Sequence, residues 1–125
     1  NQTIKAMAEA EAYHGPSIII GYAPCEMHGV KGGMTNCQKE MKRAVEAGYW
    51  QMFRYNPMLK AEGKHPLTVD SKAPTASYRD FITSETRYSR LQQQFPERAE
   101  VLFAKAEEAA KAKYERLVKY SEMLG

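Results

Sequence analysis

The apolar run at residues 17–23 constrains the fold of this chain more than any other feature. The segment reads SIIIGYA and does not alternate polar with apolar residues, as a strand with one solvent-facing side would. Continuous apolar strands are typical of parallel sheets that helices cover on both faces. We therefore expect a buried parallel strand at 17–23, with Cys25 just beyond its carboxyl end.

A helix and a second strand are expected to follow this first strand. Thr35 stands three residues before Gln38, a spacing typical of a helix start, and Gly48 ends the helical pattern. The expected buried face of this helix consists of Cys37, Met41, Ala44 and Val45. The aromatic residues of 49–55 favour a strand. Parallel strands joined through a helix cross over with right-handed sense, so this region predicts a βαβ unit.

Further helices are expected on both sides of this unit. A first helix over 3–13 ends at Gly15 and Pro16, which stop a helical pattern. Ser77 and Asp80 resemble a cap for a third helix, which continues until Pro96 starts a long last helix. The apolar stripe of the last helix consists of Leu102, Phe103, Ala106, Ala109, Ala110 and Leu117. This stripe is expected to pack on the domain, with a partner chain as the alternative.

The predicted fold class is therefore α/β. Residues 1–75 contain the short parallel βαβ unit, and residues 76–125 form carboxy-terminal helices that pack on it as one structural unit. Glycines at 29–33 predict a loop. Residues 56–74 are loop-like as well, and within them 67–69 is either a strand or an extended anchor.

Composition and charge exclude several classes of partner. The 125 residues are 43% hydrophobic, which suits one domain, and 18 basic against 15 acidic residues give a net charge of +3. No segment is basic enough to predict binding to nucleic acid. The longest apolar run is far shorter than the roughly 20 residues that cross a membrane, and no signal-peptide pattern is present. A cytoplasmic location is expected by default.

The two cysteines are expected to be free thiols, because the chain lacks secretory features. For Cys25 three interpretations are open: an inert packed thiol, a nucleophile activated by a base such as His28, or one thiolate of a metal site. An iron–sulfur cluster needs about four thiolates, so this chain cannot complete one alone. Neither a phosphate-binding loop nor a dinucleotide fingerprint is present.

A set of motifs taken together resembles one family closely. They are YAPC at 22–25, HG at 28–29, GM at 33–34, AGYW at 47–50, FRYNP at 53–57 and LTVDSKAP at 67–74. In this order and spacing they resemble the carboxy-terminal end of pyruvate:ferredoxin (flavodoxin) oxidoreductases, within the thiamine diphosphate-binding domain. The resemblance extends over nearly the whole chain, but over only a small final part of a very long enzyme.

The resemblance implies an activity that belongs to the intact enzyme. Members of the family oxidatively decarboxylate pyruvate with coenzyme A to acetyl-CoA and CO2, and they reduce ferredoxin or flavodoxin. The implied cofactors are thiamine diphosphate, Mg²⁺ and 4Fe–4S clusters, and the implied partners are the rest of the polypeptide and a second copy in a homodimer. The isolated chain is expected to bind none of these cofactors and to be inactive, with no catalytic residue of its own.

One site residue follows from the resemblance. In the family, the cysteine of the Tyr-Ala-Pro-Cys motif is a ligand of the cluster nearest the thiamine, so the metal-binding role is carried to Cys25. Cys37 has no such counterpart, because the family usually shows serine there. The absence of an initiator methionine also leads us to expect a segment of a longer protein. The alternative hypothesis is a stand-alone, non-catalytic interaction or structural domain.

Overall fold

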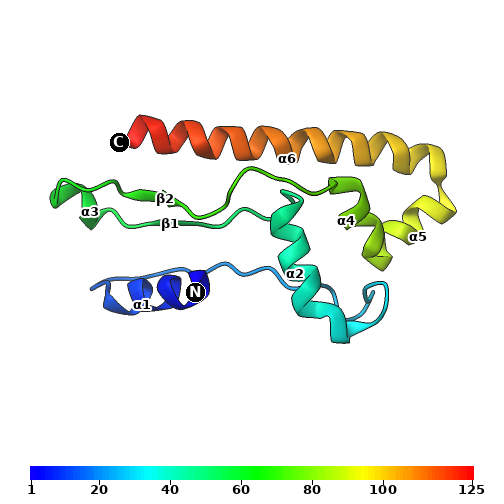
Figure 1. Ribbon diagram of the computed structural model, residues 1–125, viewed down its shortest axis with the longest axis horizontal. Coiled ribbons are helices and arrows are strands. Elements are labelled where there is room, and N and C mark those ends of the chain that lie inside the picture. The colour runs from blue at the N-terminus through cyan, green and yellow to red at the C-terminus, as the bar shows by residue number, and fades with distance from the viewer.

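The chain combines helices with one small sheet. The computed structural model describes all residues 1–125 and has the element order α1 (Gln2–Ala12), a 3-10 turn (Met34–Asn36), α2 (Cys37–Glu46), β1 (Phe53–Tyr55), α3 (Met58–Ala61), β2 (Leu67–Val69), α4 (Tyr78–Ser84), α5 (Thr86–Gln94) and α6 (Pro96–Leu124). Helix α6 runs along one side of the molecule, and α1 lies on the opposite side of the two strands (Figure 1). No helix combines the length and the apolarity that crossing a membrane requires.

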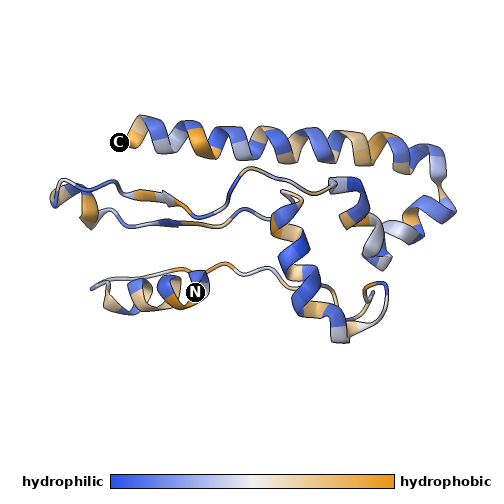
Figure 2. Ribbon diagram, in the orientation of Figure 1, coloured by the Kyte–Doolittle hydropathy of each residue, from blue (hydrophilic) through white to orange (hydrophobic).

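Helix α6 confirms the predicted long last helix. Pro96 occupies its first turn, where the missing N–H has no intrahelical partner to lose. Hydrophobic and hydrophilic residues are interspersed along the whole length of α6 (Figure 2). Its buried positions are Ala99 and Phe103, whereas Leu102, which was expected on the buried stripe, is 44% exposed. The stripe is therefore narrower than predicted and turned toward α4 and α5.

The core lies where α2, α4 and α6 meet. It consists of Ala44, Ala47, Tyr78, Phe81, Ile82, Ala99 and Phe103. Phe81 and Ile82 are almost completely buried, and burial of one such side chain contributes roughly 1.5–3 kcal/mol to stability. These residues come from both sides of the expected boundary at residue 75, although that boundary itself stays a prediction.

The expected third helix is two helices. Its predicted cap is confirmed, because Ser77 Oγ accepts a hydrogen bond from the Asp80 N–H at 3.2 Å. Helix α4 ends at Ser84, and Glu85 has an extended backbone with φ −87° and ψ 121° before α5 begins. Glu85 forms an isolated antiparallel bridge with Val30, whose two hydrogen bonds are made by the neighbouring Ser84 carbonyl and Thr86 N–H.

The only sheet is a two-stranded antiparallel one. Strands β1 and β2 pair with Phe53 opposite Val69 and Tyr55 opposite Leu67. Residues 67–69 are therefore a strand, which decides between the two predicted possibilities. Of the strand expected at 49–55, only the last three residues form one.

The predicted buried strand at 17–23 is wrong for this chain. The segment is extended but joins no sheet, and Ile18 and Ile20 are 87% and 75% exposed. A strand needs a neighbour to which its N–H and C=O groups can bond, and this chain places no strand beside the segment. The parallel βαβ unit is accordingly not formed within residues 1–125, although the coarser mixture of helices and strands is confirmed.

The buried face of α2 also differs from the prediction. Glu40, Ala44 and Ala47 point into the core, whereas Cys37 is half-exposed and Met41 is exposed. The prediction excluded charged residues from the buried face. Glu40 can be buried because Ser84 and Arg43 hydrogen-bond its carboxylate.

Helix α1 is attached by polar contacts, since it buries no residue completely. Arg54 in β1 forms a bidentate pair with Asp70 at 2.8 and 2.9 Å and also contacts Glu9 of α1. Gln2 Nε2 donates to Asp70 at 3.0 Å. Asp70 therefore connects α1 to the sheet. The hydrogen bond from Arg54 is the main reason that the pKa of the Asp70 carboxyl is lowered, against partial burial.

We predict that Asp70→Asn lowers the free energy of unfolding of the chain at pH 7 by about 1.5–3 kcal/mol, because a charged hydrogen-bond network is lost. It should also speed hydrogen exchange in α1. The folded pKa of Asp70 lies below its unfolded value near 3.9, so the stabilisation is complete above that pH and is lost as the pH falls through the folded pKa.

The two proteins should therefore differ in denaturant unfolding at pH 7 and converge at strongly acidic pH. Glu62→Gln is the matched control, because the Glu62–Lys64 pair is exposed on both sides and such pairs contribute little. A difference that persists unchanged at acidic pH would contradict the assigned role of the Asp70 carboxylate.

Candidate functional site

Cys25 lies in a tight turn at the end of the extended segment. Its carbonyl accepts a hydrogen bond from the Gly29 N–H at 2.8 Å. Gly29 has φ +74°, a left-handed conformation that favours glycine. The preceding Pro24 is buried, while Cys25 itself is half-buried and free. The turn thus presents a thiol at the protein surface.

The structure brings Cys25 and His28 together. Cys25 Sγ lies 3.0 Å from His28 Nδ1. The pKa of the Cys25 thiol is lowered, first by this hydrogen bond and then by the backbone N–H of His28. Hydrogen bonds to sulfur favour the thiolate, which is the form that both nucleophiles and metal ligands use.

The nucleophile interpretation lacks a third component. A catalytic base is normally held in place by a further group that bonds its second nitrogen. His28 is exposed, and its only hydrogen bond is the one to Cys25. The pair therefore supplies an accessible thiolate without the oriented base that acyl-transfer chemistry needs.

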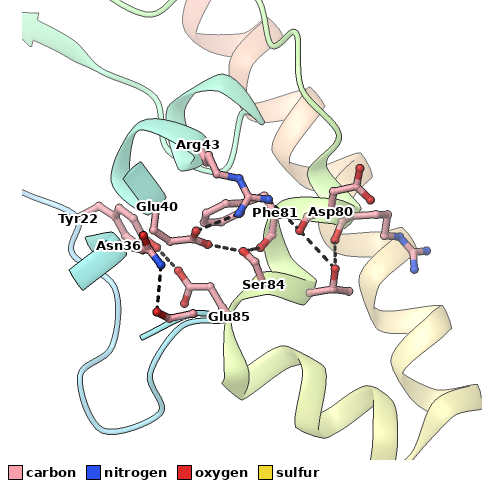
Figure 3. A network of polar contacts seen from close by, with 11 residues as sticks. Tyr22, Asn36, Glu40, Arg43, Asp80, Phe81, Ser84 and Glu85 are labelled. Atoms are coloured by element: carbon pink, nitrogen blue, oxygen red, sulfur yellow. Dashed lines mark hydrogen bonds and ion pairs between the residues drawn. The ribbon is translucent and has the colours of Figure 1, made fainter. Parts of the chain in front are cut away.

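Both ends of the Cys25 loop contact the segment around Glu85. On the carboxyl side, Lys31 N–H donates to the Ser84 carbonyl at 2.8 Å and Thr86 N–H donates to the Gly29 carbonyl at 3.2 Å. On the amino side, the Tyr22 hydroxyl donates to Glu85 Oε1 (Figure 3). Burial and the neighbouring carboxylate raise the pKa of the Tyr22 hydroxyl, so it remains a donor at neutral pH.

A second buried carboxylate belongs to the same polar network. Glu40 accepts hydrogen bonds from Ser84 Oγ and, at 3.1 Å, from Arg43 Nη1 (Figure 3). Arg43 also reaches the Asp80 carbonyl at 3.4 Å. The network joins α2 to the end of α4, directly beside Glu85.

The motifs at 22–25 and 47–50 meet in an aromatic cluster. The ring of Tyr22 packs edge-on against Tyr49, with centroids 5.5 Å apart, and lies 5.9 Å from Trp50. Tyr49 in turn lies 4.9 Å from Phe81 in the core. The residue three positions before Cys25 is therefore seated on the core, although the Ile18–Ile20 segment before it is exposed.

Cys25 fits an iron–sulfur cluster as one ligand but not as a complete site. Its thiol is free and half-buried, and the backbone N–H groups of Met27 and His28 help to lower its pKa, as suits a ligated thiolate. The chain contains no group of three or more His, Cys, Asp or Glu side chains arranged to hold a metal ion. Cys37 lies at the start of α2 beside Met41, 3.9 Å from its sulfur, and forms no such group with Cys25.

The sequence did not predict the role of Glu85. Tyr22 and Glu85 are 63 positions apart, and no spacing rule joins them. The residues around Glu85, ITSETRYSR at 82–90, are mostly polar, and nothing in this stretch distinguishes the glutamate, which is 1% exposed in the structure.

Comparison with known proteins finds relatives of one kind, although it finds no matching family model. A pyruvate:ferredoxin oxidoreductase of Moorella thermoacetica is 57% identical over 122 residues, which cover 98% of this chain and 10% of the relative. Pyruvate-flavodoxin oxidoreductases of Klebsiella pneumoniae and Enterobacter agglomerans are 51% and 50% identical over 91% and 98% of this chain, again 10% of each relative.

The chain thus spans about one tenth of the length of these curated relatives. Because the match covers 98% of this chain, it extends over the Cys25 loop, the sheet and at least part of every helix. The chain therefore belongs to the pyruvate:ferredoxin/flavodoxin oxidoreductase family, as the counterpart of one short segment of that enzyme.

Proposed function

We propose that this chain is the carboxy-terminal part of the thiamine diphosphate-binding domain in an enzyme that oxidatively decarboxylates pyruvate. With coenzyme A the whole enzyme would form acetyl-CoA and CO2 and reduce ferredoxin or flavodoxin in the cytoplasm. The observation that carries the proposal is the 57% identity over 98% of the chain. The activity belongs to the whole enzyme, for which the family resemblance implies a homodimer, and the segment by itself has none.

Within that enzyme, the role of Cys25 is to supply one thiolate to a 4Fe–4S cluster. The geometry supports this role because the thiol is half-buried, free and presented by a turn whose backbone N–H groups face the sulfur. The other ligands come from outside residues 1–125, since no group of three or more His, Cys, Asp or Glu side chains that could hold a metal ion is formed here. When bound, the cluster accepts electrons removed from the substrate on thiamine diphosphate and Mg²⁺.

The exposed isoleucines support a sheet that is completed by the rest of the polypeptide. Ile18, Ile19 and Ile20 are all more than half exposed, and their extended backbone has no strand beside it. Apolar surface with unpaired backbone groups is normally covered by a partner. The parallel arrangement expected from the sequence would then form between this segment and strands that lie elsewhere in the enzyme.

We predict that Cys25→Ala in the full-length enzyme removes one cluster, because alanine offers no donor atom to iron. The iron-to-protein ratio should fall, and the electron paramagnetic resonance signal of one reduced cluster should disappear. Cys37→Ala is the matched control and should leave both unchanged. Iron content and spectra that are identical in Cys25→Ala and the wild type would contradict the ligand assignment.

We also predict that the isolated chain binds a hydrophobic dye and self-associates as its concentration rises, because Ile18 and its neighbours lack a cover. Changing Ile18 and Ile20 to serine should abolish most of the dye binding. Met123→Ser, at an exposed apolar position of α6, is the control and should not. A wild-type chain that stays monomeric and binds no dye would favour the stand-alone domain instead.

A further inference from the structure

Glu85 is the one residue that contacts the Cys25 loop from both of its ends. We infer that Glu85 is a positioning residue for Cys25, acting through the Tyr22 hydroxyl on one side and the Val30 backbone on the other. The inference rests on the proposed function in that the positioned thiolate is taken to be a cluster ligand. The contact geometry itself does not depend on that function.

The side chain of Glu85 holds the amino end of the loop. Glu85 Oε1 accepts the hydrogen bond of the Tyr22 hydroxyl, three residues before Cys25 (Figure 3). The Tyr22 ring is fixed at the same time by its packing on Tyr49 and Trp50. A hydrogen bond from a neutral hydroxyl to a buried carboxylate is among the stronger ones in proteins.

The backbone on both sides of Glu85 holds the carboxyl end. Val30, five residues after Cys25, forms the antiparallel bridge with Glu85. One hydrogen bond lies on each side of this bridge, from Lys31 N–H to the Ser84 carbonyl and from Thr86 N–H to the Gly29 carbonyl. Val30 is 6% exposed, so this end of the loop is also anchored by burial. This pairing requires the extended conformation that separates α4 from α5 at Glu85.

Glu85 is itself buried beside a cation. Its side chain is 1% exposed, and its Oε2 lies 3.3 Å from Arg87 Nε. This ion pair offsets part of the cost of a buried negative charge, although neither of the two atoms has a hydrogen-bond partner. Arg87 Nη2 donates to the Tyr49 hydroxyl at 2.7 Å, so the cation is fixed to the same aromatic cluster. Residues 22–30 are therefore closed into a loop whose base is a rigid part of the core.

This closure has a consequence for Cys25. The thiol lies near the middle of a nine-residue loop, at a turn that the Cys25–Gly29 hydrogen bond shapes. If either end of the loop were released, the sulfur would sample more positions. A ligand that is held by supporting contacts needs less ordering when the metal group binds.

The test uses the full-length enzyme with Tyr22→Phe and Glu85→Gln. Tyr22→Phe keeps the packed ring and loses only the hydroxyl. Tyr78→Phe is the control, because Tyr78 belongs to the same aromatic cluster but its hydroxyl forms no hydrogen bond. The readouts are amide hydrogen exchange of residues 25–30, the midpoint potential of the cluster nearest the thiamine, and its electron paramagnetic resonance spectrum.

Both test variants should speed exchange of residues 25–30 by about tenfold, the effect of one lost hydrogen bond to a charged group. They should also shift the potential and the spectrum, while Tyr78→Phe changes none of the three. Exchange and spectra in Tyr22→Phe that match the wild type would overturn the inference. Faster exchange with an unchanged potential and spectrum would also overturn it, because Glu85 would then hold the loop without acting on the ligand.

Cys25→Ala in parallel separates this inference from the proposed function. If that variant keeps every cluster, the ligand assignment fails, whatever Glu85 does. If it loses a cluster while Tyr22→Phe and Glu85→Gln leave exchange and spectra unchanged, the ligand assignment stands and the positioning role of Glu85 fails.

Discussion

The buried carboxylate of Glu85 is the interaction on which the arrangement of the Cys25 loop depends. It joins the loop to the point where α4 ends and α5 begins. Tyr22 hydrogen-bonds one of its oxygens, and Arg87 forms an ion pair with the other, which has no hydrogen-bond partner. A buried carboxylate is costly unless it is paired and hydrogen-bonded, so the network around it has little freedom to rearrange. The contacts of Glu85 therefore hold the loop that presents the accessible thiol of Cys25.

The rest of the chain divides into a part that forms its own core and a part that does not. Phe81, Ile82 and Phe103 are buried where α2, α4 and α6 meet, without help from other chains. Ile18–Ile20 and the apolar side of α1 are left open, and α1 is attached through charged side chains instead. A segment of a larger enzyme is expected to have both kinds of surface, because part of its natural packing is supplied by residues outside it.

Elements that depend on local chemistry could be predicted from the sequence. The Ser77 cap and the start of α6 at Pro96 depend on neighbouring residues and were confirmed. The strand at 17–23 was wrong because strand formation depends on partners, and the sequence shows the apolar pattern without showing where those partners are. The buried face of α2 was wrong because the pattern could not show that Ser84 and Arg43 satisfy Glu40. Cys25 was found through a motif, whereas Glu85 became visible only once the fold joined two distant segments.

The central claim is that Cys25 supplies a single thiolate to a cluster whose other ligands lie outside this chain. It is tested most directly by a high-resolution cryo-electron microscopy map of the full-length enzyme in its cluster-loaded form. The account predicts continuous density between Cys25 Sγ and one iron of a 4Fe–4S cluster, with the Tyr22–Glu85 contact preserved beside it. A cluster fully ligated by other residues, with Cys25 still bonded to His28, would contradict it.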